Sequence, residues 1–178
     1  RQDPQESPKS SWIIHFRLIM KKHLIVLDMD GTLLNSNKEI SSLTKNYLLE
    51  LSKQGNKIIL ASGRPLRALI SYYNELKLDT PMICYNGALI INPKDKTFNT
   101  TAYTFPPQDC IEIANDLKDH ICKVMCEDDG SVFINEEDEY LNNYFWYKGM
   151  NIVKGEIKDI LNTNLLTFIA KCKGNIEK

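Results

Sequence analysis

The sequence carries almost no net charge and no long apolar run. Its 22 Lys and Arg nearly balance 23 Asp and Glu, for a formal charge of -1, so neither nucleic acid nor an anionic membrane is an expected partner. The apolar stretch 12–20 is too short to span a bilayer and is interrupted by His15 and Arg17. It also makes a poor signal peptide, because Asp3 and Glu6 precede it. These observations predict a globular, cytoplasmic protein.

Closely paired cysteines are also missing. The five cysteines make an odd number and contain no Cys-x-x-Cys pair, which favours free thiols in a reducing cytoplasm. His120, Cys122 and Cys126 lie close together in the sequence, so a zinc site is an alternative there. The alternation of Cys122, Val124 and Cys126 instead favours one buried face of a strand.

Biased composition is confined to the N-terminus. Residues 1–11 are rich in Pro, Ser and charge, a composition typical of disorder. Met20, followed by Lys21 and Lys22, resembles a natural start immediately before the first apolar run. We therefore expect residues 1–19 to be a disordered or non-native extension outside the fold.

Residues 20–91 alternate between strand and helix patterns. Three short, continuous apolar runs are typical of parallel strands buried on both faces, and two apolar stripes at helical spacing separate them. This order predicts an α/β fold with a Rossmann-like, doubly wound parallel sheet and right-handed crossovers. We expect strands at 24–27, 57–61 and 82–85, a helix at 43–51 capped by Ser41 or Ser42, a helix at 66–76 after Pro65, and a hairpin turn at Asn86-Gly87 into 88–91.

Residues 92–178 have a different pattern, with paired strands and separate helices. This pattern predicts an α+β unit distinct from the first, with the boundary near residue 91. We expect strands at 97–103 and 165–172, a helix at 107–117, and a hairpin of 122–126 with 131–134 around Asp129-Gly130.

Polar residues follow each of the three expected parallel strands. Asp28 and Asp30 follow the first strand, Ser62 and Gly63 the second, and Asn86 the third. Ligands of such sheets bind at the carboxyl ends of the strands. We therefore expect these residues to gather at one edge of the sheet.

The segment around Asp28 and Asp30 indicates phosphoryl chemistry. Two carboxylates two residues apart after a strand can point to the same side, and such an oxygen-rich cluster suits Mg²⁺. Phosphate monoesters hydrolyse extremely slowly without a catalyst. A carboxylate nucleophile would split the reaction through an aspartyl phosphate, a metal would neutralise charge, and a second acid would protonate the leaving oxygen. A solvated acidic turn is the alternative for a bare Asp-x-Asp.

The turn after the second expected strand is a candidate anion site. Ser62 offers a hydroxyl, and Ser62 to Pro65 lie where a helix begins. Backbone N–H groups at a helix start bind anions readily. A plain helix cap is the alternative.

Three segments together resemble the Cof-type, subclass IIB branch of the haloacid dehalogenase (HAD) superfamily. The resemblance implies that Asp28 is the nucleophile and a metal ligand, and that Asp30 is the general acid/base and a second ligand through its backbone carbonyl. It places Ser62, Gly63 and Asn86 at the phosphate, and it makes residues from about 92 a mobile α+β cap that selects substrate. The segments are Leu27-Asp28-Met29-Asp30-Gly31-Thr32-Leu33-Leu34, Ala61-Ser62-Gly63-Arg64-Pro65 and Tyr85-Asn86-Gly87-Ala88.

Two features of that family's site are missing from this sequence. The family has a lysine and a Gly-Asp-x-x-x-Asp pair after the cap, whereas this sequence ends at Lys178, within the cap-like region. The acidic run 136–139 inside that region resembles a solvated helix start instead. We therefore expect the chain to be C-terminally truncated, and feebly active or inactive by itself.

The expected function is Mg²⁺-dependent hydrolysis of a small phosphate monoester through an aspartyl phosphate. The partner would be a small phosphorylated metabolite, either a sugar phosphate or a phosphorylated cofactor. A phosphomutase of the same superfamily and an inactive or binding fragment are alternatives. A response-regulator receiver is another, although it needs an Asp at the end of the third strand, where this chain has Cys84, Tyr85 and Asn86.

Overall fold

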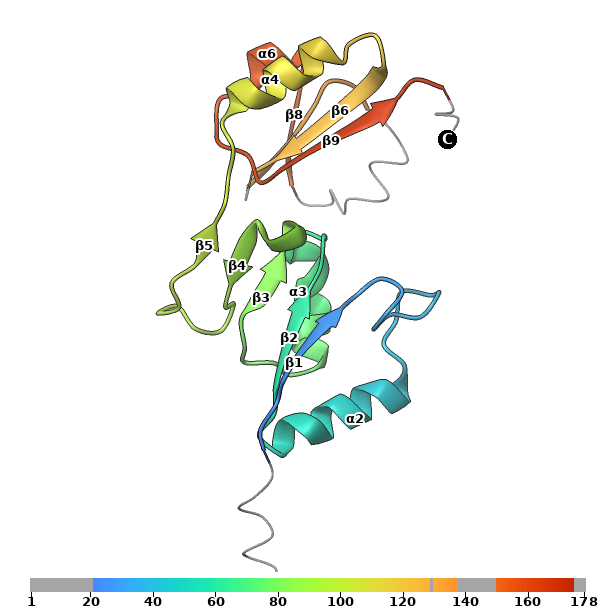
Figure 1. The fold of residues 1–178 in the computed structure, drawn as a ribbon, viewed down its shortest axis with the longest axis vertical. Coiled ribbons are helices and arrows are strands. Elements are labelled where there is room, and N and C mark those ends of the chain that lie inside the picture. Colours follow the sequence, from blue (N-terminus) through green and yellow to red (C-terminus); the bar gives the residue numbers. More distant parts are fainter. Residues whose placement is uncertain (1–20, 129, 138–149, 175–178) are drawn as a thin grey trace, which may run out of the picture.

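The computed structural model describes residues 21–128, 130–137 and 150–174. The expected N-terminal extension, residues 1–19, lies outside this part of the chain, as do Asp129, Asp138 and Glu139. The described elements form two units, each built on its own sheet (Figure 1). None of the helices in this part of the chain has the length and apolar character needed to cross a membrane.

The first unit is a five-stranded mixed sheet with the order β1-β2-β3-β4-β5. Its first three strands run parallel, whereas β3, β4 and β5 pair antiparallel. The antiparallel part arises because the chain turns back directly after β3, as Asn86-Gly87 predicted. The strands are β1 (Leu24–Asp28), β2 (Lys57–Ala61), β3 (Met82–Cys84), β4 (Leu89–Ile91) and β5 (Thr101–Ala102).

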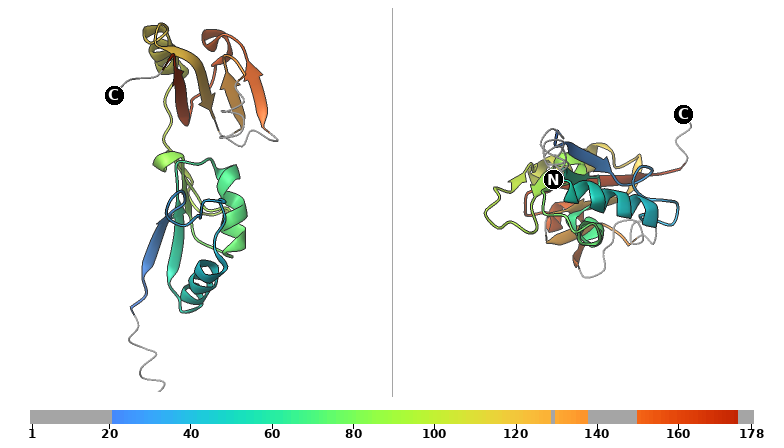
Figure 2. Two further views of the ribbon diagram at one scale, coloured as in Figure 1. Left: turned by 90° about the vertical axis from the view of Figure 1, so that its right-hand side faces the viewer. Right: turned by 90° about the horizontal axis from the view of Figure 1, so that it is seen from below.

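Helices α2 (Ser42–Lys53) and α3 (Leu66–Glu75) connect the parallel strands and lie on the same side of the sheet (Figure 2). Ser41 caps α2, since its hydroxyl accepts the backbone N–H of Thr44 at 3.2 Å. Pro65 occupies the cap position of α3 instead of its first turn. Between helices and sheet lies a core of fully buried side chains, which includes Leu60, Leu69, Tyr73 and Met82.

The prediction that the first strand is buried on both faces is wrong for the described chain. Leu24 and Val26 of β1 are 63% and 52% exposed, whereas Ile25 and Leu27 pack against the core cluster. The cause is topological, because β1 is an edge strand and both helices cover the opposite face of the sheet.

The first sheet continues beyond residue 91, where the sequence pattern changes. Strand β5 pairs with β4, with Leu89 opposite Ala102, so the expected boundary falls inside this sheet. Only this two-residue piece of the expected strand 97–103 forms a strand. The chain then passes to the second unit through residues 103–106 (Figure 1).

The second unit is a four-stranded sheet with the order β8-β7-β6-β9. Strand β6 is antiparallel to both β7 and β9, and β7 is parallel to β8. Helices α4 (Pro107–Asp116) and α6 (Ile157–Ile160) cover the face turned away from the first unit (Figure 1). The strands are β6 (Ile121–Glu127), β7 (Ser131–Ile134), β8 (Asn151–Lys154) and β9 (Thr167–Cys172).

Candidate active site

Asp28 ends β1, beside the end of β2. It lies opposite Ala61 in the parallel register, so it neighbours the turn that begins at Ser62. Met29 is fully buried, whereas Asp28 and Asp30 are exposed, as expected for alternating directions after a strand. The Asp28 carboxylate accepts the Thr32 hydroxyl at 3.3 Å. Gly31 allows the chain to turn here, because its φ of 77° lies in the left-handed region.

Asp30 is held by two basic side chains, Arg64 and Lys38, to which the sequence alone assigned no role. Arg64 donates from Nε and Nη2 to the two carboxylate oxygens, each at 2.6 Å, and Lys38 donates to Oδ1 at 2.7 Å. The hydrogen bond from Arg64 is the main cause that lowers the pKa of Asp30 to about 2, with Lys38 acting in the same direction. Asp30 is therefore an ionised acceptor in this structure.

Arg64 is well placed to bind the Asp30 carboxylate, because it is only 6% exposed and its guanidinium lies over the Tyr72 ring. A planar, forked donor pairs with a carboxylate through two parallel hydrogen bonds. The position of Arg64 inside the Ser-Gly-Arg-Pro turn could have indicated its place in the site. No sequence feature indicated that Lys38, in the loop before α2, would pair with Asp30.

The turn from Ser62 to Arg64 joins β2 to α3 and binds the turn that follows β3. The Ser62 hydroxyl accepts the backbone N–H of Arg64 at 3.2 Å. Two backbone bonds tie the turns together, from Asn86 to the Ser62 carbonyl and from Tyr85 to the Arg64 carbonyl, each at 3.1 Å. The structure thus brings Asp30, Ser62 and Asn86 together around Arg64.

Gly63 is required by the close approach of Asn86. A Cβ at position 63 would lie 2.8 Å from the Asn86 side-chain oxygen. A larger residue would therefore displace Asn86. The exposed Asn86 side chain and the exposed Gly63 backbone form one small polar surface beside Ser62.

The donors at this sheet edge fit a magnesium ion better than a metal that prefers several protein ligands. Within the described ranges, no three His, Cys, Asp and Glu side chains form a group able to hold a metal. Mg²⁺ is commonly held by one or two carboxylates and completes its shell with water. The Asp28 carboxylate and backbone oxygens of the following loop are donors of this kind, whereas the Asp30 carboxylate is occupied by Arg64 and Lys38.

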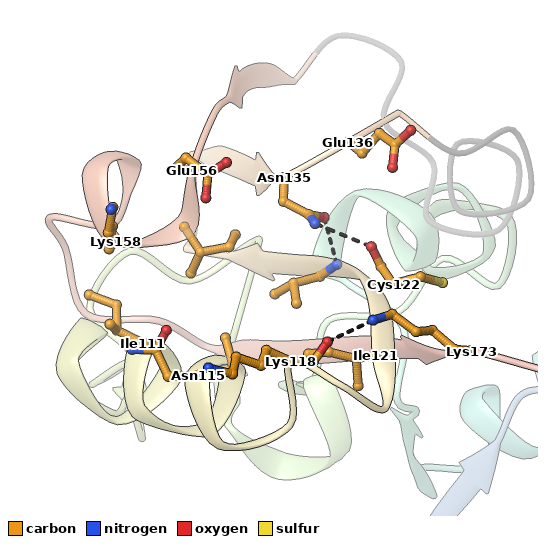
Figure 3. A pocket seen from close by; sticks show the side chains of 13 residues that line it. Ile111, Asn115, Lys118, Ile121, Cys122, Asn135, Glu136, Glu156, Lys158 and Lys173 are labelled. Atoms are coloured by element: carbon orange, nitrogen blue, oxygen red, sulfur yellow. Dashed lines mark hydrogen bonds between the residues drawn. The ribbon is translucent and has the colours of Figure 1, made fainter.

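A separate cavity of about 520 Å³ lies in the second unit, between α4, α6 and β6 (Figure 3). Asn135 lines it and crosses to β6, where it accepts from the Val124 N–H at 2.7 Å and donates to the Cys122 carbonyl at 3.3 Å. Lys173 donates to the Lys118 carbonyl at its rim at 2.8 Å. None of the site residues predicted from the sequence lines this cavity.

Most of the chain is similar in sequence to known proteins. Residues 25–177 match the family model of haloacid dehalogenase-like hydrolases. The chain is 29% identical over 155 residues to the 5-amino-6-(5-phospho-D-ribitylamino)uracil phosphatase YitU of Bacillus subtilis, over 86% of this chain and 57% of that protein.

Solved structures agree with the family match. A haloacid dehalogenase-like hydrolase from Bacteroides thetaiotaomicron has a TM-score of 0.64 at 27% identity, over 82% of this chain and 56% of that chain. A HAD subclass IIB sugar phosphatase shares the fold, with a TM-score of 0.61 at 20% identity over 82% and 56% of the two chains. The chain spans little more than half the length of these relatives. It belongs to the haloacid dehalogenase-like hydrolases.

Proposed function

We propose that this protein is a Mg²⁺-dependent phosphatase that hydrolyses a small phosphate monoester through an aspartyl phosphate. The observation that carries the proposal is the position of Asp28 and Asp30 at the end of β1, beside the Ser62-Gly63 turn after β2. The first unit would be part of a Rossmann-like, doubly wound core. The second unit would be the cap that selects substrate.

The proposed reaction has two steps. In the first, an Asp28 carboxylate oxygen attacks phosphorus, and the bond from phosphorus to the ester oxygen breaks. Asp30, which is ionised in this structure, would enter this step in its protonated form and give the leaving oxygen that proton. In the second, Asp30 takes a proton from water, and the water oxygen attacks phosphorus and displaces the Asp28 carboxylate. Inorganic phosphate leaves, and both carboxyl groups return to their starting states.

The other residues at this edge would hold the phosphoryl group. The Ser62 hydroxyl and the Gly63 N–H would donate to its oxygens, with the Asn86 amide beside them. Mg²⁺, held by the Asp28 carboxylate and the Asp30 backbone carbonyl, would supply neutralisation of the phosphate charge. Asp30 as found here is in the state that accepts a proton, so Arg64 and Lys38 would stabilise the form needed for the second step.

The proposed substrate class follows from the similarity to known phosphatases. A sugar phosphate or a phosphorylated cofactor is proposed, because the name of the similar Bacillus phosphatase gives a phosphorylated ribitylamino-uracil as its substrate. The second unit would contact the part of the substrate beyond the phosphate.

The test compares the full-length gene product with its Asp28→Asn variant, using p-nitrophenyl phosphate and a panel of sugar and cofactor phosphates. Turnover is expected with Mg²⁺ and not with a chelator, and Asp28→Asn should abolish it, because an amide is a poor nucleophile and metal ligand. Asp79→Asn is the matched control, since Asp79 is exposed and lies before β3 at the opposite end of the sheet. Unchanged turnover in chelator or in Asp28→Asn would refute the mechanism.

A further inference from the structure

A buried carboxylate of the second unit is bound by two side chains of the first. Glu127, at the end of β6, is 1% exposed. Its Oε2 accepts Arg67 Nη2 of α3 at 2.8 Å and the Tyr85 hydroxyl at 3.1 Å. Arg67 also donates to the Tyr85 hydroxyl at 3.3 Å, so the three groups form a closed triangle between the units.

The strand geometry explains why Glu127 faces the first unit. Val124 and Cys126 belong to the core cluster on the helix side of the second sheet, whereas Met125 belongs to a different cluster. Alternate residues of a strand share a face, so Glu127 lies on the same face as Met125. The backbone carbonyl of Glu127 accepts the N–H of Leu166 at 2.8 Å. Leu166 itself packs in the core cluster of the first unit. An apolar contact between the units therefore lies next to the polar contact that Glu127 makes with Arg67 and Tyr85.

Tyr85 links this triangle to the candidate phosphate site. It begins a short 3₁₀ turn, Tyr85–Gly87, on the side of the first unit that faces the second sheet (Figure 1). Its φ of 50° and the φ of 56° at Asn86 are both left-handed, a conformation that is costly for a bulky residue. Such a conformation persists only where surrounding contacts hold it. The phenol is fixed by Glu127 and Arg67, and the backbone by the Arg64 carbonyl.

We propose that Glu127 is a positioning residue: through Tyr85 and Arg67 it holds the Tyr85–Gly87 turn, and with it the Asn86 side chain against Gly63. This inference rests on the proposed function, in which Asn86 and Gly63 line the phosphate site. It assigns to the cap-like unit a direct influence on phosphate binding, separate from any contact with the rest of the substrate. Glu127 itself touches no reacting atom.

The experiment measures kcat, KM and inhibition by inorganic phosphate for the full-length protein and its Glu127→Gln variant. The glutamine keeps the size of the side chain but loses the charge that pairs with Arg67. We expect KM and the phosphate inhibition constant to rise together by about fivefold or more, with kcat little changed. Glu136→Gln, an exposed change in the same unit, should leave both constants unaltered.

A second variant separates positioning from general loss of stability. Tyr85→Phe removes the hydroxyl and keeps the ring, so it should raise the same two constants. The double variant should raise KM and the phosphate inhibition constant no more than the more affected single variant does, because both substitutions break the same connection between Glu127 and Tyr85. Additive effects, or lower stability with unchanged constants for phosphate, would overturn the proposal.

One readout is independent of turnover. In protein labelled with ¹⁵N-glycine, the Gly63 amide resonance should shift in Glu127→Gln and not in Glu136→Gln. An unmoved Gly63 resonance overturns the positioning role even if the protein is an active phosphatase. A shifted resonance in a protein without phosphatase activity upholds the positioning role and refutes the proposed function.

Discussion

At the scale of single residues, Ser62 is the sharpest test of the phosphate site. The serine is buried, and its hydroxyl lies at the turn where a phosphoryl oxygen would bind. Ser62→Ala should lower kcat by about 10²-fold, the effect of removing one donor from such a site. Steady-state kinetics of the full-length protein measure this effect. Ser71→Ala, the same change at an exposed position of α3, is the control, and equal turnover in both variants would exclude Ser62.

Glu127 also makes a prediction about stability and pH. Burial raises the pKa of Glu127 above its ordinary value of 4.5, although Arg67 opposes the shift and Asp128 adds to it. A group whose pKa is raised on folding contributes stability that is complete below its unfolded pKa. That contribution is lost as the pH rises through the folded pKa.

A comparison of the wild type with the Glu127→Gln variant isolates this titration. The free energy of unfolding of the wild type should fall relative to that of the variant as the pH rises above about 4.5. Burial raises the pKa of Tyr85, whose hydroxyl faces the carboxylate, so Tyr85 keeps its proton over this range. Urea unfolding at pH 4 to 7 measures the difference, and parallel pH profiles for the two proteins would contradict the prediction.

At the scale of elements, the start of α2 depends on one side chain. Ser41 accepts the Thr44 N–H, one of the backbone donors that a helix start leaves without a partner in the helix. Ser41→Ala should lower the free energy of unfolding by about 1 kcal/mol. Ser42→Ala, one residue later in the exposed first turn, should change it little. Denaturant unfolding of both variants checks the difference, and equal losses would show that capping is not the cause.

Sequence patterns located most elements because strand and helix periods are local properties. The bounds of β2 match the expected strand 57–61, and the helix expected at 107–117 is α4. The short β8 and α6 were missed, since runs of four residues carry too few apolar positions to show a period. Burial of β1 was misjudged because an apolar run does not say which later element covers it.

The location of the candidate residues at one edge of the sheet was predictable from the sequence, whereas their contacts were not. Asp28, Asp30 and Ser62 were expected at that edge because each follows an apolar strand. The pairing of Asp30 with Arg64 joins residues 34 apart, and that of Tyr85 with Glu127 joins residues 42 apart. Such pairings depend on how the units meet, and a single sequence carries no pattern for them.

At the scale of the whole molecule, the uncovered face of β1 predicts how the chain behaves alone. Leu24, Val26 and Tyr47 form an exposed apolar area along the sheet edge, and such areas favour association. The 178-residue chain should bind a hydrophobic dye more strongly than the full-length gene product and unfold with weaker cooperativity. Dye fluorescence and thermal unfolding measure both effects.

A substitution localises that binding. Val26→Lys should reduce dye fluorescence of the chain, whereas Ile113→Lys, a similar change on α4, should reduce it less. Equal dye binding by the chain and the full-length protein would show that β1 needs no further cover.

The triangle of Glu127, Arg67 and Tyr85 also has a consequence for the order of folding. Each sheet closes through pairings within its own part of the chain, residues 24–102 for the first and 121–172 for the second. The triangle can form only after α3, the Tyr85–Gly87 turn and β6 exist, so it is expected to be absent from the transition state. Loss of such a contact accelerates unfolding and leaves the refolding rate almost unchanged. Docking of the two units is therefore expected to be the last event of folding and the first of unfolding.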